Sequence, residues 1–411
     1  MKPCVGAASL LMVAVMVSVS AGAALAETDG GWSEPVNVSD SVWRISSYGD
    51  TVVAHGVDTC VVSVDGGDTW GEELLVEGML EAGDGVIYRA NITGYPDYGD
   101  TVYFSKSTDD GQTWSSPVGV LTLEEWNDWA YGVYMLGSTL VMYSYDSAGT
   151  DEGRIVASRS TDEGATWSAQ SVVDPYVHVE DPIPADMVLW DGKMYLAYWN
   201  YSYESPEFDH VVLTESADMG LTWTNRQVVA EGVLPNLAAN GDSLFITYFG
   251  LDGTDGLGVY FTESADGATW SEPVLVGPVE DVDDFVLIHS LATVGDDIFV
   301  GYTDLVSSGD DYSFVAHANH SADGGATWTD MGDVAGAGAE AGFIWMDASN
   351  GRVHALMSIF EDSSDEVDVY YTQISLATDG GVDILWVALA VACVAAVAVA
   401  AAVLLIRRRQ A

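Results

Sequence analysis

STDEGATW, residues 160–167, decides the fold, because its order of serine, aspartate, glycine and tryptophan recurs six times along the chain. The copies begin at Ser63, Ser107, Ser160, Ser216, Ser264 and Ser321, and the copy at Ser264 is one residue shorter. Successive serines lie 44 to 57 residues apart. That period is typical of four-stranded propeller blades and not of helical solenoids.

Each motif lies between two β-rich runs, as in VYFTES before and WSEPVLV after the copy at Ser264. Alternating apolar residues around a short Asp/Gly turn predict a hairpin. The aspartate can accept backbone N–H bonds, the glycine can take a positive φ, and the tryptophan can pack across the hairpin. We therefore interpret these residues as structural: Asp65, Trp70, Asp109, Trp114, Asp162, Trp167, Asp218, Trp223, Asp266, Trp270, Asp323 and Trp328.

The motif resembles the Asp-box (BNR) repeat of bacterial neuraminidases, S-x-D-x-G-x-T-W, over nearly the whole chain between two terminal apolar segments. The resemblance implies an all-β, sialidase-like propeller. It also implies that the boxes lie between the third and fourth strands of each blade, on the face away from the active site. On this interpretation the boxes are scaffold, and function belongs to the opposite face.

The blade count depends on the two ends of the repeat region. Residues 32–36, WSEPV, copy the strand that starts at Trp270, but no box precedes them. Residues 352–360 and 367–375 look like second and third strands without a fourth. We therefore expect seven blades, with the N-terminal strand closing the last one and removing the free edges. Six blades are the alternative.

The two ends also predict export and anchoring. Residues 1–26 have a lysine, an apolar stretch and a terminal Ala-Leu-Ala, which indicate a signal peptide. Residues 384–406 are uncharged and long enough to span a bilayer, and three arginines follow in the tail 407–411. We expect residues 27–379 to form an ectodomain of a single-pass cell-surface protein whose C-terminus is cytoplasmic.

The composition limits the partners. The formal net charge of −51 argues against nucleic acid or anionic lipid and is typical of a salt-adapted surface. Outside the terminal segments Cys60 is the only cysteine, so no disulfide framework is expected and Cys60 is predicted to be buried in a strand. Asn37, Asn91, Asn200 and Asn319 each begin an N-x-S/T sequon. We expect a monomer.

The candidate ligand site is the face opposite the boxes, where the loops are rich in tyrosine, tryptophan and carboxylates. Aromatic platforms among carboxylates suit sugar rings, so a glycan or a surface protein is the expected ligand. The loops contain no EF-hand spacing, so no cofactor is predicted, although Ca²⁺ remains an alternative. The candidate ligand-binding residues are Trp126, Asp128, Trp129, Glu180, Asp181, Tyr203, Asp284 and His289.

An enzymatic function is the alternative. Sialidases carry an early Arg-Ile-Pro motif whose arginine joins two others in gripping a carboxylate, and Arg44-Ile45-Ser46 stands at the matching place. Of the other arginines only Arg89 is placed to reach a central pocket, and Asp58 is the positional candidate for the acid. The sequence thus leaves open a binding propeller, a glycoside hydrolase of the sialidase-like group, and a purely structural envelope protein.

Overall fold

The computed structural model of the protein describes residues 31–376. It leaves out residues 57, 93–100, 124–130, 147–151, 179–184, 201–209, 253–255, 280–287, 309–310, 335–339 and 361–366. Within the described ranges no helix has the length and apolar character needed to span a bilayer. The predicted signal peptide 1–26, membrane segment 384–406 and tail 407–411 lie outside these ranges.

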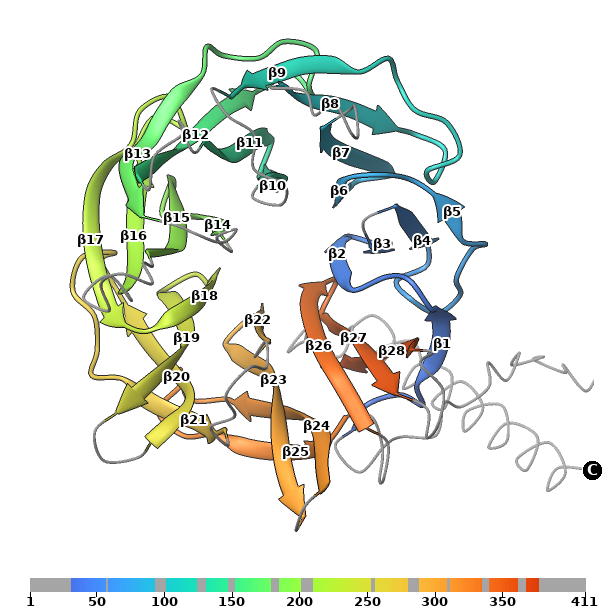
Figure 1. Cartoon of the computed structure of the whole chain (residues 1–411), viewed down its shortest axis with the longest axis vertical. Coiled ribbons are helices and arrows are strands. Elements are labelled where there is room, and N and C mark those ends of the chain that lie inside the picture. Colours follow the sequence, from blue (N-terminus) through green and yellow to red (C-terminus); the bar gives the residue numbers. More distant parts are fainter. Residues whose placement is uncertain are drawn as a thin grey trace, which may run out of the picture.

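The described strands form seven four-stranded antiparallel sheets arranged as blades around a central axis (Figure 1). Blade 1 comprises β2 (Arg44–Tyr48), β3 (Thr51–His55), β4 (Thr59–Ser63) and β5 (Leu74–Leu75). Blade 2 comprises β6 (Met79–Gly83), β7 (Val86–Ile92), β8 (Thr101–Ser107) and β9 (Val118–Thr122). Blade 3 comprises β10 (Tyr131–Leu136), β11 (Thr139–Asp146), β12 (Glu152–Ser160) and β13 (Ser171–His178).

The remaining blades repeat this order. Blade 4 comprises β14 (Ala185–Trp190), β15 (Lys193–Asn200), β16 (His210–Ser216) and β17 (Thr224–Glu231). Blade 5 comprises β18 (Val233–Ala239), β19 (Leu244–Asp252), β20 (Gly256–Ser264) and β21 (Val274–Pro278). Blade 6 comprises β22 (His289–Val294), β23 (Asp297–Ser308), β24 (Asp311–Ser321) and β25 (Thr329–Asp333). Blade 7 comprises β26 (Glu340–Ser349), β27 (Arg352–Phe360), β28 (Val367–Ser375) and, from the other end, β1 (Val36–Ser39).

The ring is closed by the N-terminal strand, as the sequence predicted. In the antiparallel β1–β28 pair, Val36 lies opposite Tyr371. Trp32, 1% exposed, packs in the core between blades 6 and 7. The Ser33 amide donates to the Gln373 carbonyl at 2.8 Å, as the serine after a box tryptophan does within its own blade. The seven-blade prediction is therefore confirmed.

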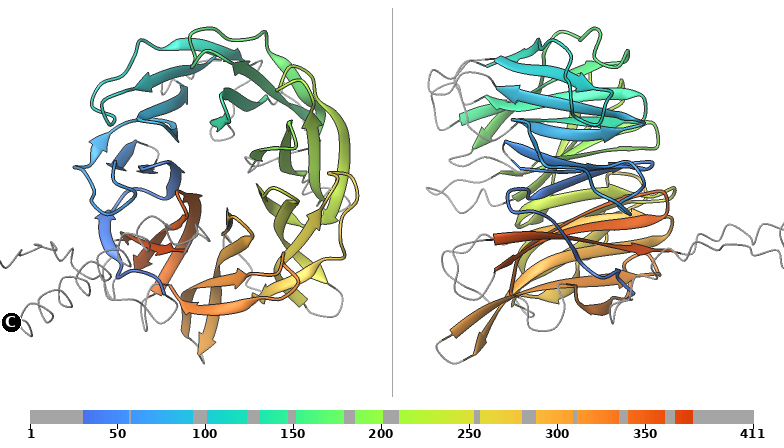
Figure 2. Two further views of the ribbon diagram at one scale, coloured as in Figure 1. Left: turned by 180° about the vertical axis from the view of Figure 1, so that it is seen from behind. Right: turned by 90° about the vertical axis from the view of Figure 1, so that its right-hand side faces the viewer.

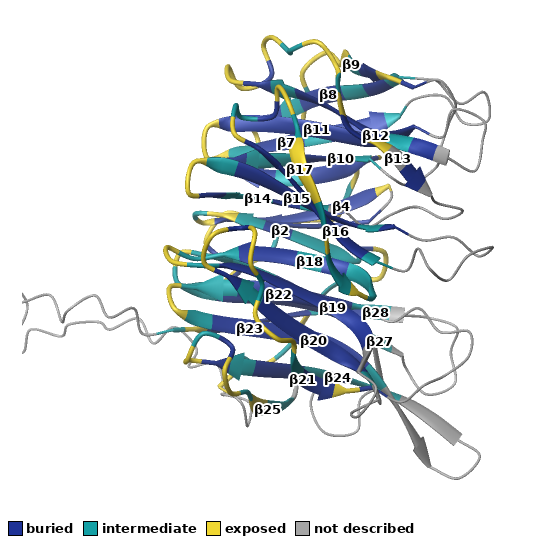
Figure 3. Cartoon of the chain, turned by 90° about the vertical axis from the view of Figure 1, so that its left-hand side faces the viewer, coloured by how far each residue is buried: buried dark blue, intermediate teal, exposed yellow. Residues whose placement is uncertain are grey.

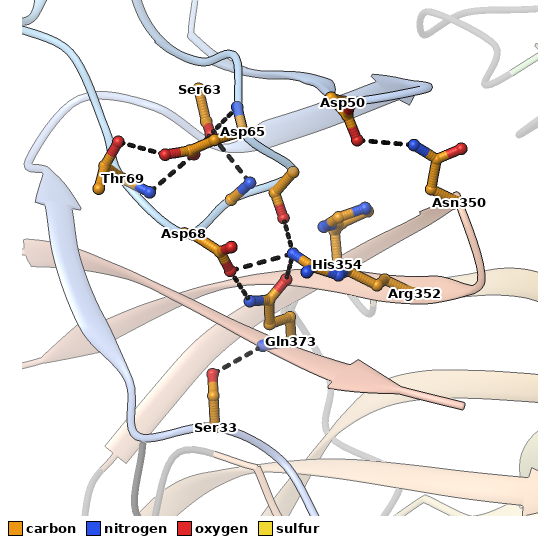
Figure 4. A network of polar contacts seen from close by, with 12 residues as sticks. Ser33, Asp50, Ser63, Asp65, Asp68, Thr69, Asn350, Arg352, His354 and Gln373 are labelled. Carbon is orange, nitrogen blue, oxygen red and sulfur yellow. Dashed lines mark hydrogen bonds and ion pairs between the residues drawn. The ribbon is translucent and has the colours of Figure 1, made fainter. Parts of the chain in front are cut away.

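A polar network joins blade 7 to blade 1 beside this strand (Figure 4). Arg352 Nη1 on β27 donates to the Gly66 carbonyl at 2.8 Å and to Asp68 Oδ1 at 3.0 Å, both in the box turn of blade 1. The same nitrogen donates to Gln373 Oε1 at 3.3 Å on β28. Arg352, which in sequence stands in an ordinary turn, thus fastens the first box to the last blade.

The box turns are held by bonds to one aspartate. In the box of blade 3, Ser160 Oγ and the Thr166 amide both donate to Asp162 Oδ1 at 2.8 Å, and Thr166 Oγ1 donates to Oδ2 at 2.6 Å. The Gly164 amide donates to Ser160 Oγ at 2.8 Å. Thr166 and Ser160 lower the pKa of Asp162 to about 2. The other five boxes repeat these bonds.

Each box also packs on the blade before it, where we had expected contact across its own hairpin. Trp167 meets Phe104, on β8 of blade 2, edge to face with ring centroids 5.0 Å apart. Gly164 has φ +82°, and a Cβ placed on it would lie 2.0 Å from Phe104 Cε1. Trp70 and Trp328 contact Tyr371 and Phe261 of their preceding blades in the same way. The box is therefore an interlock between blades as well as a turn.

The two faces of the ring differ. The box turns and the short turns between first and second strands lie on one face of the ring and include exposed residues (Figure 3). The side view shows the strands of the blades running from this face to the opposite one (Figure 2). β28 ends at Ser375, which lies opposite Arg352 at the turn between the first and second strands of blade 7. Ser33 bonds to Gln373, near the same end of β28. Both ends of the described chain therefore lie at the box face. Cys60 is buried in β4 as predicted, and burial raises the pKa of its thiol to about 11.

Substitution of Gly164 by alanine tests the interlock. We expect a loss of about 2–5 kcal/mol of stability, because a left-handed φ costs about 1–2 kcal/mol and overpacking against Phe104 costs about 1–3 kcal/mol. Gly192 is the matched control, since its φ is +73° and a Cβ added there would meet no described atom within 4 Å; Gly192→Ala should cost only about 1–2 kcal/mol. Urea unfolding of both variants measures this, and equal losses would show that the close approach is unimportant.

Substitution of Arg352 by alanine tests the closing seam. We expect a loss of about 1–2 kcal/mol, because several charge-assisted bonds disappear from a site that is partly open to water. Lys106→Ala is the control, since Lys106 also bridges two blades but its partner Glu163 is 71% exposed; its loss should stay below about 0.5 kcal/mol. Limited proteolysis should also cut the β1 segment faster in the Arg352 variant, and an unchanged cleavage rate would contradict the role given to the seam.

Candidate functional site: the axial pocket

A cavity of about 500 Å³ lies on the axis of the ring. It is lined by residues of the first strand of every blade, β2, β6, β10, β14, β18, β22 and β26, with His55 and Tyr143 behind them. Each first strand is an edge strand of its sheet and contributes consecutive residues to the lining, such as Arg44–Tyr48 of β2. We call this cavity the axial pocket.

Arg44 is the basic group of the axial pocket. It is the first residue of β2, at the end of the strand next to the loop face. Its guanidinium carbon lies 5.7 Å from the centre of the Trp43 ring and 5.3 Å from that of Trp345 on β26, and Nη1 points to Met79 Sδ at 3.6 Å. Two indole contacts orient the planar cation while leaving its other N–H groups for a ligand.

Three carboxylates from three blades also line the pocket, and each accepts a backbone N–H from the next blade. Glu81 Oε1 accepts from Met135 on β10 at 3.0 Å, and Asp186 Oδ2 accepts from Leu237 on β18 at 2.8 Å. Asp347 Oδ2 accepts from Ser47 on β2 at 2.5 Å. The carboxylates thus join neighbouring first strands, and each of their oxygens accepts at least one bond within the protein.

Burial and mutual repulsion change the proton affinity of these groups. Burial, with the charges of Asp347 and Asp186 added, raises the pKa of Glu81 to about 8, although the Met135 amide opposes the shift. Burial raises the pKa of Asp347 to about 6 and raises that of Asp186 as well. At neutral pH Glu81 is therefore protonated while Asp347 is largely ionised, so the pocket contains both an acid and a base.

Tyr134 and two histidines complete the polar lining. The Tyr134 hydroxyl hydrogen-bonds to Asp186, and its ring stacks on Tyr143 with centroids 5.9 Å apart. Burial raises the pKa of Tyr134 well above 10. Burial also lowers the pKa of His55 to about 3 and that of His289 to about 4, so both imidazoles are neutral and can donate or accept one bond each.

Two of the residues predicted from the sequence meet in this pocket, namely Arg44 and His289. Asp58 is exposed in the β3–β4 loop, where its carbonyl accepts from the Val76 amide at 2.8 Å, and it does not line the cavity. The other candidates lie outside the described residues: Trp126, Asp128, Trp129, Glu180, Asp181, Tyr203 and Asp284.

The suggestion that Arg89 reaches the pocket is wrong. Arg89 lies on β7, a second strand, and its Nε donates to Ser105 Oγ at 2.8 Å. Its guanidinium stacks on the box tryptophan Trp114 at 4.5 Å. Among the described residues that line the axial pocket Arg44 is the only arginine. The described residues also contain no group of three or more His, Cys, Asp or Glu side chains arranged to hold a metal ion.

The sequence did not predict Glu81, Tyr134, Trp345 or Asp347 as site residues, because they lie in first strands and not in loops. The sequence feature that could have identified them is a polar or aromatic residue a few positions before the turn between first and second strands, as in Glu81-Ala-Gly-Asp-Gly85 and Trp345-Met-Asp347. In an ordinary sheet such residues would indicate the solvent side of an alternating strand.

Residues 93–284 match the family model of the BNR repeat-like domain. This segment is similar to a BNR repeat-like domain over a little less than half of the chain. The recognition of the chain as an Asp-box propeller with a sialidase-like fold is thereby confirmed. No curated protein sequence is significantly similar to the chain.

Solved structures resemble the propeller at low sequence identity. The polysaccharide lyase Uly1 is 13% identical, with a TM-score of 0.52 over 87% of this chain and 95% of the lyase. The phage phi92 endosialidase is 12% identical, with a TM-score of 0.48 over 86% and 70% of the two chains. The Trypanosoma rangeli sialidase in complex with sialic acid is 14% identical, with a TM-score of 0.44 over 83% and 58%. At these identities the similarity concerns the fold alone.

Replacement of Glu81 by glutamine tests the charge state of the pocket. The folded protein keeps a proton on Glu81 that the unfolded chain releases above about pH 4.5, so this group lowers the stability progressively from about pH 4.5 to about pH 8. Glu81→Gln removes that component, and the variant should gain stability relative to the parent as the pH rises through this window. Urea unfolding at pH 5, 7 and 9 measures the difference.

Asp347→Asn provides the comparison, because its window should end near pH 6. Two stability differences that do not change with pH would contradict the assigned proton affinities.

Proposed function

We propose that the protein binds a glycan by taking a terminal sugar unit into the axial pocket. The observation that carries this proposal is the arrangement of Arg44 beside the indole rings of Trp43 and Trp345, in one pocket with carboxyl groups from three other strands. A sugar presents apolar ring faces and hydroxyl edges, and it needs aromatic surface together with donors and acceptors. A cavity of about 500 Å³ falls within the range of small-ligand sites.

The charges of the pocket favour neutral or amino sugars. Arg44 shares the pocket with Asp347, which is largely ionised at neutral pH, and with Asp186, and the whole chain has a net charge of −51. An acidic sugar would have to rely on Arg44 alone against this field. A hydroxyl-rich or cationic sugar would instead donate to Asp347 and Asp186, because a carboxylate oxygen can accept a second bond.

We further propose that this propeller is displayed at the cell surface, anchored by residues 384–406 with the tail 407–411 inside. The net negative charge disfavours nucleic acid as a ligand. We propose a glycan as the ligand, with a surface protein as the alternative partner. Because both ends of the described chain lie at the box face, an anchor after Leu376 would turn the opposite face of the ring, where Arg44 begins β2, away from the membrane. That orientation would present this end of the axis to external glycans.

A glycoside hydrolase is the second candidate, and one observation favours it. Glu81, with a pKa near 8, and Asp347, with a pKa near 6, lie in one cavity. A protonated and an ionised carboxyl are the two groups that glycosidic hydrolysis requires, one to protonate the leaving oxygen and one to activate water or attack the sugar. Tyr134, bonded to Asp186, is a further polar group beside them.

A glycan array followed by titration of the best ligand tests the proposal. Trp345→Ala should weaken binding by about tenfold or more, because it removes a stacking surface and the support of Arg44. Leu75→Ala is the control, since Leu75 is 88% exposed on the outer strand β5, and its affinity should stay within about twofold of the parent. Thermal unfolding of each variant verifies that it is folded.

A panel of fluorogenic sugars separates the two candidates. Binding on the array without turnover supports the glycan-binding role, whereas turnover that falls about 10²-fold or more in Glu81→Gln supports the hydrolase. Cleavage of a sialoside that is lost in Arg44→Ala would overturn the preference for neutral or amino sugars. A blank array together with a blank panel would contradict both candidates.

A further inference from the structure

The structure separates the four N-x-S/T sequons into one accessible asparagine and three buried ones. Asn37 is exposed on β1, the outer strand of blade 7. Asn91, Asn200 and Asn319 are 6%, 5% and 4% exposed. All three lie on second or third strands, which are paired on both edges. A glycan on any of these three would have to occupy the packed core, which has no room for it.

The buried asparagines have neighbours that a glycan would displace. Asn319 Nδ2 lies 3.4 Å from the Val276 carbonyl and 3.5 Å from the Tyr302 hydroxyl. The Cβ of Asn91 lies 2.7 Å from the position that a Cβ on Gly78 would take, so the backbone just before β6 passes close to it. These side chains are part of the sheet packing, whereas Asn37 borders solvent.

The order of synthesis gives Asn37 a second advantage. Each buried asparagine pairs with a residue of the same hairpin, so its strand can pair soon after synthesis. The pairs are Asn91 with Tyr103, Asn200 with His210 and Asn319 with Val300. The N-terminal segment must wait for β28, because Ser33 and its partner Thr372 are 339 residues apart. At about 5–20 residues per second β1 therefore stays unpaired for roughly 17–70 s.

We propose that Asn37 is a site of N-linked glycosylation, modified on the exported chain before β1 closes the ring. The proposal rests on the export proposed above. The co-reactant is a lipid-linked oligosaccharide phosphate. Asn37 Nδ2 attacks C1 of its first sugar, the N–C1 bond forms as the C1–O bond to phosphate breaks, the lipid phosphate leaves with the electron pair, and the amide gives up one proton. No oxidant or reductant is needed.

The glycan would cover the one outer strand that comes from the far end of the chain. Among the described strands β1 pairs with β28 alone, so its other edge faces outward, and it carries Val36, which is 46% exposed. Exposed strand edges promote pairing between molecules, and a bulky solvated group on the edge prevents it. Asn37 lies at the rim of the ring and not at the axial pocket, so the modification leaves the ligand site open.

Mass spectrometry after expression in a eukaryotic secretory host tests the proposal. The full chain is produced with its own residues 1–26 and with the host's secretion signal in their place. We expect one N-glycan, mapped to Asn37, which is removed by a peptide-N-glycosidase and absent in Asn37→Gln. Ser39→Thr should retain it, because threonine keeps both the sequon and the hydroxyl that Ser39 donates to Glu73. Asn91→Gln should retain it as well.

The outcomes separate this inference from the export on which it rests. If only the form with the host signal is secreted and it carries the Asn37 glycan, the export proposal fails and the glycosylation site stands. A secreted, folded protein without a glycan at Asn37, or with one at Asn91, Asn200 or Asn319, would overturn the inference.

Discussion

The pairing of β1 with β28 is the constraint on which the rest of the structure depends. It joins the two ends of the described chain, and Trp32 and Arg352 reinforce it from either side. The same closure assembles the axial pocket. The bond from the Ser47 amide to Asp347 spans 300 residues of sequence, and Trp345 reaches Arg44 only because blade 7 lies beside blade 1. An open ring would keep most of its blades but would lack the site.

The carboxyl groups of the boxes and those of the axial pocket have pKa values shifted in opposite directions. Box aspartates such as Asp162 are held ionised by hydrogen bonds, so their contribution to stability is lost only as the pH falls from about 4 toward 2. The pocket carboxyls are held partly protonated by burial, so their effect appears above about pH 4.5 for Glu81 and above about pH 3.8 for Asp347. Stabilisation is therefore concentrated on the box face and at the blade junctions, and the axis carries groups whose proton affinity is unfavourable for folding but suited to ligand chemistry.

The sequence predicted those parts of the fold that are encoded locally. A box is a turn of eight residues, and its period revealed the blades; the copy of a post-box strand at Trp32 revealed the closure.

The pocket is not encoded locally. Whether Glu81 faces solvent, a neighbouring blade or the axis depends on its strand being the first of its blade and on the ring being closed. Arg89 shows the same limit, because it stands in a strand that alternates well but is the second of its blade, so its side chain meets Trp114. The loop residues expected to bind ligand, from Trp126 to Asp284, lie outside the described residues, and their role stays a prediction.

The central claim is that ring closure builds a glycan site on the propeller axis, and a crystal structure of the protein soaked with its best array ligand tests it most directly. The account predicts a sugar ring in the axial pocket, stacked beside Trp345 and within hydrogen-bond distance of Arg44 or one of the three pocket carboxyls. Sugar density found only at the box face or along the outer strands, with the axial pocket filled by water, would contradict it.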